Sequence, residues 1–329
     1  DFFRNKKKFL LVVMLMVVTL TGCSVPRGQN GKTYVNSIYT NNDVQVKRGD
    51  VDIPDDKELQ KKYKDYKADD LITIEKTTFS DAMDEGWFNG LIVWPIAFLI
   101  NFVADFSDAG IGIIAATFLI QLLIFLFSIK SQVASQRMQS IQPEMNKIQA
   151  KYAGKTDDRS KMQQAQEMQA LYSKYKINPF GTLLVTFIQF PVILGMYQAT
   201  MRAYSVVTGS FQGINLAKTP IEGFNLDNYW YVVIFVLMVA FQLLSFKMPQ
   251  WLQEHRKKKM HVKEKKYAEP KKKGGNGMMG SMNMMMYMST GMIAIFAINW
   301  PLGMSFYWLV NSLARVIQNI VIHKFFIKD

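Results

Sequence analysis

Five long apolar stretches, separated by polar and basic segments, organise this chain. They cover residues 109–130, 179–204, 229–248, 281–299 and 302–323. Each is about 20 residues long, which is what an α-helix needs to cross the hydrocarbon core of a bilayer. We therefore predict an all-α membrane protein with five transmembrane helices. The last two are joined by a tight turn at Asn299–Gly303.

The fifth stretch carries polar residues on one helical face. Trp308, Asn311, Arg315, Gln318 and Ile322 recur at spacings of three and four residues. An arginine within a bilayer costs about 3 kcal/mol or more, so Arg315 is expected to face protein or water. One interpretation is a hydrophilic groove, and the other is a hydrogen-bond cluster that only holds helices together.

Two further amides interrupt the apolar stretches. Gln121 is the only strongly polar residue of the first, and Gln189 lies in the second beside Pro191. We predict that the substrate groove is lined by Gln121, Gln189, Asn311, Arg315 and Gln318. Gln242, in the third stretch, is not included in this set.

The N-terminal residues have the pattern of a lipoprotein signal peptide. Three lysines, Lys6 to Lys8, precede an apolar run that ends in Leu20-Thr21-Gly22-Cys23. We predict a signal peptide over residues 1–22 and lipidation of Cys23, the single cysteine of the chain, on the outer membrane face. A buried free cysteine in a retained helix is the alternative.

The segment before the first span is expected to stay outside. Residues 23–86 are polar and show no sustained apolar period, which predicts a flexible extracellular tether with one short helix near 55–68. Residues 87–106 are apolar but broken by polar residues and Pro95. A sixth span would put the basic loops outside, so we predict an outer interfacial helix with Trp87 and Trp94 as anchors.

Two basic segments lie between spans. Residues 131–178 carry methionine, isoleucine and tyrosine at helical spacing in two runs separated at Gly154, which predicts a cytoplasmic helical hairpin. Residues 249–280 form a still more basic loop, with Arg256 to Lys259 and Lys271 to Lys273. The outer loop, 205–228, holds little positive charge, so both basic segments and the tail, 324–329, are predicted to be cytoplasmic.

Composition limits the chemistry. The net charge is +13, and 49% of the 329 residues are hydrophobic, so apolar and basic blocks are segregated. One cysteine and three histidines give no metal-ligand pattern, and no catalytic grouping stands out. We expect no enzymatic activity and no cofactor. The lysine clusters serve as topology determinants, or they contact anionic membrane lipids or ribosomal RNA.

Several short motifs follow one another in order along the chain. They are Ile141–Glu144, Met168–Tyr172, Asn178–Gly181, Ile188–Pro191, Pro301–Gly303 and Tyr307–Trp308. Together they resemble the YidC/Oxa-type membrane protein insertases, in their Gram-positive lipoprotein form. The resemblance, over residues 85 to 325, implies five spans around a groove open to cytoplasm and lipid. It also implies a functional hairpin, nascent membrane proteins as clients delivered by the ribosome, and work alone or beside the SecYEG translocon.

The first span departs from the family pattern. Where the family has an arginine nine residues before the lysine that ends this span, the chain has Gln121 before Lys130, and Leu126 holds the position of a proline. Arg315 lies nine residues before Lys324, so Gln121 and Arg315 are expected at the same depth. We predict that the positive charge of the groove has moved from the first span to the fifth.

The sequence thus predicts an insertase and foldase that passes short polar client segments through the groove and releases client helices into lipid. A small-solute transporter or channel is the alternative. We see no inverted repeat that would favour it.

Overall fold

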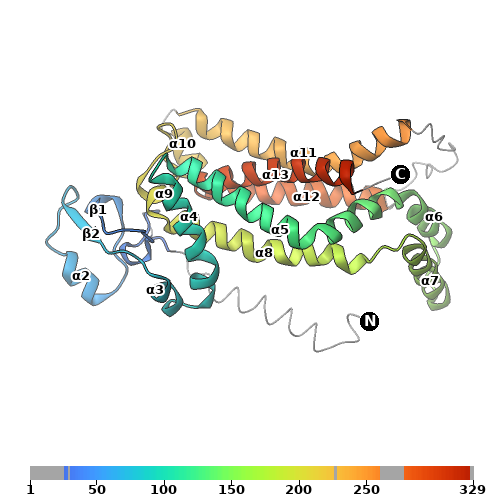
Figure 1. Cartoon of the computed structure of the whole chain (residues 1–329), viewed down its shortest axis with the longest axis horizontal. Helices are drawn as coiled ribbons and strands as arrows, with labels where there is room; N and C mark the ends of the chain where they lie inside the picture. The colour runs from blue at the N-terminus through green and yellow to red at the C-terminus, as the bar shows by residue number, and fades with distance from the viewer. Residues whose placement is uncertain (1–25, 29, 226–227, 260–277, 327–329) are drawn as a thin grey trace. The chain divides into compact units, whose positions relative to one another are not determined.

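The computed structural model is mostly helical (Figure 1). It describes the chain except residues 1–25, 29, 226–227, 260–277 and 327–329, so the predicted signal peptide, Cys23 and the Lys271 to Lys273 cluster lie outside the described residues. Two compact units are distinguished. The first takes the chain up to Leu119 with Gln189–Phe235 and Ala297–Tyr307, and the second takes Ile120–Ile188, Val236–Phe296 and the chain from Trp308.

Short elements come first along the chain. They are η1 (Val35–Ser37), β1 (Val44–Lys47), η2 (Arg48–Asp50), α2 (Lys57–Tyr63), β2 (Leu71–Ile74), α3 (Phe79–Asp84), the π-helical turn η3 (Asn89–Val93) and α4 (Trp94–Ala104). The remaining elements are α5 (Ala109–Ser140), α6 (Gln142–Tyr152), α7 (Asp158–Lys174), α8 (Pro179–Arg202), α9 (Tyr204–Thr208), α10 (Pro220–Asn225), α11 (Trp230–Lys259), α12 (Met278–Asn299) and α13 (Leu302–Phe325).

The segment that we expected to be a flexible tether is folded, which corrects that expectation. Strands β1 and β2 pair antiparallel, from Val44 opposite Ile74 to Lys47 opposite Leu71. Alternate residues of both strands are buried, as the period of a strand requires. They share a small core, which includes Val35, Ile38, Val46, Val51, Tyr63, Ile72 and Ile74 from this segment and Val207 from α9. We call residues 26–86 the outer module after the side of the membrane predicted for them, which stays a prediction.

The caps of the outer module follow from its sequence. The Asp56 side chain accepts the backbone N–H groups of Glu58 and Leu59 and so begins α2, the short helix that the sequence predicted near 55–68. Thr78 and Asp81 form a capping box at the start of α3. A polar sequence therefore builds regular elements here without long apolar periods.

Two helices are long and apolar enough to cross a membrane by length and hydropathy. They are α5 and residues Trp230–Arg256 of α11. The apolar helix over residues Asn89–Ala104 is shorter than a span requires. The five predicted spans all fall on helices, and their crossing of a membrane stays a prediction.

The helices that contain the first and third predicted spans extend beyond the ends predicted for these spans. α5 continues from Lys130 to Ser140 without a break, because Gly and Pro are absent between these residues. α11 likewise continues to Lys259 through Pro249. Residues 131–140, which we assigned to the hairpin, therefore belong to α5.

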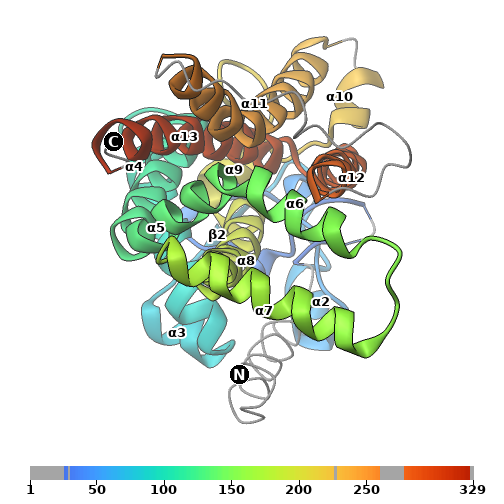
Figure 2. The same cartoon turned by 90° about the vertical axis from the view of Figure 1, so that its right-hand side faces the viewer.

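The hairpin itself consists of α6 and α7, which pack side by side (Figure 2). Gly154, with φ +82°, lies in the reversal between them, where the left-handed conformation favours glycine. Asp157 begins α7 by accepting the backbone N–H of Ser160. Ile141, Met145, Leu171 and Ile177 form the buried seam, whereas Met162, one of the methionines at helical spacing in this segment, is exposed.

Candidate functional site

The polar face of α13 contacts α5 through three amides. Gln121 donates a short hydrogen bond to the Asn311 side chain, and both residues are only 3% exposed. The Gln318 amide nitrogen donates to the Gln121 carbonyl at 3.1 Å and to its side-chain oxygen at 3.4 Å. Three of the five predicted groove residues are thus brought together. We call Gln121, Asn311 and Gln318 the amide cluster.

Arg315 lies between the two α13 members of this cluster. It follows Asn311 by four residues and precedes Gln318 by three, so all three share one helical face. Its side chain is half-buried. Because Gln121 bonds Asn311 and Gln318, which flank Arg315 along α13, this arginine lies level with Gln121 along the helix, and its depth in a membrane stays a prediction.

A second set of contacts holds the adjoining face of α13 against α11. The Gln242 side-chain oxygen accepts the indole N–H of Trp308 at 2.9 Å and the Ser312 hydroxyl at 2.7 Å. Gln242 is 3% exposed. The sequence showed it as a lone amide in an apolar stretch but gave no reason to join it to α13. Buried amides of this kind are costly unless bonded, so these contacts fix the rotation of α13.

Gln189 belongs to the other compact unit and is not brought into the amide cluster. It lies on α8 with a buried side chain, and its amide nitrogen has no hydrogen-bond partner among the described residues. A buried unpaired N–H group costs about 1–3 kcal/mol, so the position favours an additional polar partner, such as water.

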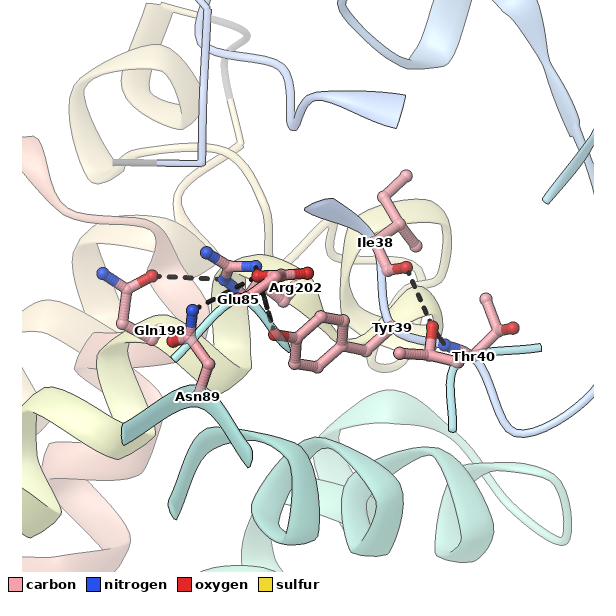
Figure 3. A network of polar contacts seen from close by, with 8 residues as sticks. Ile38, Tyr39, Thr40, Glu85, Asn89, Gln198 and Arg202 are labelled. Carbon is pink, nitrogen blue, oxygen red and sulfur yellow. Dashed lines mark hydrogen bonds and ion pairs between the residues drawn. The ribbon is translucent and has the colours of Figure 1, made fainter. Parts of the chain in front are cut away.

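A charged network joins the outer module to the end of α8 (Figure 3). The Arg202 guanidinium contacts the Glu85 carboxylate at 2.6 Å and the Tyr39 hydroxyl at 3.3 Å. Glu85 also accepts from the Tyr39 hydroxyl and from Asn89. Burial raises the pKa of Tyr39 well above its usual range. No local pattern indicates this network, because its members lie far apart along the chain.

Main-chain contacts reinforce this junction. The Tyr39 N–H donates to the Arg202 carbonyl at 2.7 Å, and the Tyr204 N–H donates to the Tyr39 carbonyl at 3.0 Å. The Thr33 hydroxyl donates to the Met201 carbonyl at 2.9 Å. Carbonyls at the end of a helix lack partners within the helix, and the bonds to the Met201 and Arg202 carbonyls supply them. The outer module therefore caps α8.

Ion pairs lie across the hairpin. Lys151 on α6 contacts Glu167 on α7 at 2.5 Å, and Tyr152 donates to the same carboxylate. Hydrogen bonds from Lys151 and Tyr152 lower the pKa of Glu167, and the same pairing raises that of Lys151. Lys174 pairs with Glu144 at 3.5 Å. These exposed pairs set the register of the two helices more than they stabilise them.

The arrangement can bind polar groups by hydrogen bonding. Amides offer both donors and acceptors, and a guanidinium adds donors and positive charge. In the part of the chain that the structure describes, no group of three or more His, Cys, Asp or Glu side chains could hold a metal ion. The site is thus suited to recognition and hydration of a polar chain.

Comparisons with known proteins point to one family. The family model described as 60Kd inner membrane protein matches residues 101–329. The chain is 30% identical over 234 residues to the membrane protein insertase MisCA of Bacillus subtilis (strain 168), covering 70% of this chain and 77% of that protein. It is 32% identical over 254 residues to membrane protein insertase YidC 1 of Streptococcus pyogenes serotype M3, covering 77% of this chain and 80% of the relative.

Proposed function

We propose, on the premise that this chain belongs to the 60Kd inner membrane protein family of YidC/Oxa-type insertases, that the polar face of α13 receives the polar segments of its clients. The protein is a membrane protein insertase and not an enzyme, and its clients are nascent membrane proteins. What remains to be assigned is the part of the chain that carries this activity.

Moving a polar segment past hydrocarbon is the physical problem to be solved. An unpaired amide or hydroxyl costs several kcal/mol in an apolar medium, and a charge costs far more. Polar side chains and water along one helix lower this cost by supplying temporary hydrogen-bond partners. The client's apolar helix then partitions sideways into lipid, and no covalent step is needed.

The observation that carries the proposal is the amide cluster with Arg315 beside it. Gln121, Asn311 and Gln318 are buried or half-buried on helices whose other faces are apolar and exposed. Each amide can exchange its internal partner for a client group at little net cost, because one hydrogen bond replaces another. Arg315 adds attraction for acidic client residues. Gln189 is the fifth predicted groove residue, and its unpaired amide nitrogen agrees with that role.

The experiment is insertion of one small single-span client into liposomes that contain the purified protein, without nucleotide. We expect Gln121→Leu with Asn311→Leu to abolish insertion, whereas Leu126→Ala, on an exposed apolar face of α5, leaves it unchanged. Solute flux without client insertion would instead support the transporter or channel, and normal insertion by the double variant would remove the cluster from the mechanism.

We also propose the finer topology. The five predicted spans surround the groove, the outer module and the loop at 205–228 lie outside, and the hairpin, the loop at 249–280 and the C-terminus lie in the cytoplasm. The distribution of lysine and arginine supports this orientation. Cys23 is the lipidated residue in this proposal, and radiolabelled palmitate incorporation that Cys23→Ala abolishes would test it.

The interfacial position of α4 is supported by an aromatic ridge. Rings of Phe79, Trp94, Phe98, Phe102 and Phe106 contact one another in succession along one side, and most of them are exposed. The opposite side, with Ile96, Ala97 and Ile100, is buried. A helix too short to span, with an exposed apolar ridge, is suited to lie at the boundary of headgroups and acyl chains.

The ribosome, the SecYEG translocon and anionic lipids are the remaining proposed partners. Positive charge in the cytoplasmic segments supports contact with ribosomal RNA and lipid headgroups. Work beside SecYEG rests on the resemblance alone. Cross-linking of the insertase to each partner in native membranes is the direct measurement.

A further inference from the structure

A second set of amides ties three helices together near the hairpin. The Gln136 side-chain nitrogen, on α5, donates to the backbone and side-chain oxygens of Asn319 on α13, both at 3.2 Å. The Gln253 side chain, on α11, donates to the Gln136 carbonyl at 2.7 Å. Asn319 donates in turn to the Ser245 carbonyl at 3.4 Å. We call Gln136, Gln253 and Asn319 the amide clamp.

The clamp lies beyond the apolar parts of α5 and α11. Gln136 follows Lys130 by six residues, and Gln253 follows Lys247 by six residues. Each glutamine therefore lies about 9 Å further along its helix than the lysine near the end of the apolar part. Water could satisfy amides at that depth, yet Gln136 is only 4% exposed. The Gln136 side chain is therefore buried by contacts within the protein, and its hydrogen bonds hold α5 in a defined position relative to α11 and α13.

The clamp directly precedes the hairpin. α5 ends at Ser140, one turn after Gln136, and α6 begins at Gln142. Hydrogen bonds run through the junction, because the Ile141 N–H donates to the Arg137 carbonyl and the Met145 N–H donates to the Ile141 carbonyl. Ile141 and Met145 are themselves buried in the hairpin seam. The direction of α6 is thus coupled to the last turns of α5.

The two contacts of α5 with α13 are spaced differently along the two helices. From Gln121 to Gln136 is about 22 Å along α5, whereas from Asn311 to Asn319 is about 12 Å along α13. The difference of about 10 Å is taken up by the reach of the amide side chains together with an inclination of α5 to α13, since Gln121 alone contacts both Asn311 and Gln318. The Ser128 hydroxyl bonds the Ile124 carbonyl within this interval, a contact that bends helices. The amide clamp is the contact of α5 with α13 that lies nearer to the hairpin.

We propose that Gln136 is a positioning residue of the insertase, which through Asn319 and Gln253 sets the direction of the hairpin relative to the polar face of α13. The inference rests on the proposed function in that the hairpin and this face act on the same client. Gln136 itself contacts no client in this mechanism. Its loss leaves the amide cluster formed and the hairpin folded but lets the hairpin adopt many directions.

The test separates hairpin direction from insertion. Spin labels at Thr156→Cys, in the exposed hairpin loop, and at Ile320→Cys, on the exposed face of α13, report the distance between the two elements in a Cys23→Ala background. We expect Gln136→Ala to broaden the distance distribution about twofold. We expect insertion to fall about fivefold, the effect of losing roughly one net hydrogen bond. The distance measurement needs no client, so it stands even if the proposed groove is wrong.

Matched variants keep the proposal falsifiable. Gln132→Ala removes an amide one turn earlier on α5 whose side chain, among the described residues, donates to Ser128 of the same helix, and it is expected to change neither readout. Gln136→Glu, of equal size but without the N–H donor, is expected to behave as Gln136→Ala. Asn319→Lys added to it restores a donor and acceptor pair and is expected to recover both readouts. An unchanged distance distribution in Gln136→Ala, equal broadening in Gln132→Ala, or no recovery in the folded double variant would each overturn the proposal.

Discussion

Arg202 and Glu85 form an ion pair that joins the end of α8 to the outer module. The guanidinium and the carboxylate are 2.6 Å apart, and the Arg202 side chain is 3% exposed whereas that of Glu85 is 35% exposed. The guanidinium also lies over the ring of Tyr39, 5.1 Å from its centroid. A buried charge with a single carboxylate partner is sensitive to the loss of that partner.

We predict that Glu85→Ala destabilises the outer module. Removing one partner of a buried pair costs about 3 kcal/mol, at the low end of the usual range because Glu85 is partly exposed. Limited proteolysis across residues 26–86 measures this in the full protein. Glu85→Leu with Arg202→Leu is the control, since it leaves no buried charge and is expected to resist proteolysis better than the single variant. Equal resistance of Glu85→Ala and the unaltered protein would contradict the prediction.

The second prediction concerns the displaced positive charge. Arg315→Ala is expected to reduce insertion of clients with acidic tails at least about tenfold, because hydrogen bonds to charged groups contribute about 1.5–3 kcal/mol. Adding Gln121→Arg is expected to restore insertion, since Gln121 bonds the residues on both sides of position 315. Leu313→Ala, on an exposed face of the same helix, is the control. Normal insertion of these clients by Arg315→Ala would refute the displacement.

The third prediction concerns the hairpin seam. Ile141→Asp with Ile148→Asp places carboxylates in the apolar contact between α6 and α7, where Ile141 is buried and Ile148 partly buried. We expect the seam to open and insertion to be lost while the protein stays in the membrane, as measured by membrane fractionation beside the liposome assay. Met162→Asp is the control, because Met162 is exposed. Full activity in the double variant would exclude the hairpin from the mechanism.

The fourth prediction concerns pH. The lowered pKa of Glu167 means that its contribution to hairpin stability is present above about pH 4, the usual carboxyl range, and is lost as pH falls through the lowered pKa. The raised pKa of Lys151 gives the opposite sign, since its contribution is present below about pH 10 and is lost as pH rises through the raised pKa.

We therefore expect the distribution of distances between spin labels at Ala150→Cys on α6 and Gln166→Cys on α7 to stay constant through neutral pH. We expect this distribution to broaden at both pH extremes. Glu167→Gln removes the carboxylate and is expected to remove its part of the acid limb. An acid limb that persists unchanged in this variant would assign it to other groups.

The fifth prediction concerns the basic loop. If Lys271 to Lys273 contact RNA or lipid headgroups, binding of ribosomes in co-sedimentation falls steeply between low and physiological salt, because counterions are released on contact. Changing the three lysines to glutamine is expected to flatten this salt dependence. Binding insensitive to both changes would leave the lysines with a role in topology alone.

The sequence predicted the helical part of the fold because its signals are local. Apolar length marks α5 and α11, and period and glycine mark the hairpin. The outer module was not predicted, because its core draws single apolar residues such as Val35 and Val46 from polar surroundings and completes them with Val207, far along the chain. Such a core has no local period to detect.

The candidate site was predictable to a similar extent. Polar spacing on one helix grouped Asn311, Arg315 and Gln318, and Gln121 stood out as the only strongly polar residue of the first apolar stretch. The partners of Gln242 and Gln136 were not predictable, because they depend on the rotation of α11 and α5 about their axes. An isolated amide in an apolar stretch indicates that a hydrogen-bond partner exists, but it does not indicate which helix supplies that partner.

The capping of α8 by the outer module has a consequence for evolution. The bonds between Tyr39 and the backbone of residues 202 and 204 are made by main-chain atoms, which every amino acid except proline can supply. These backbone bonds do not depend on the identity of the side chains, in contrast to the contacts of Glu85 and Thr33 with α8. The family match begins at residue 101, just past this module. The attachment therefore constrains the path of the backbone in the outer module more than it constrains the side chains there.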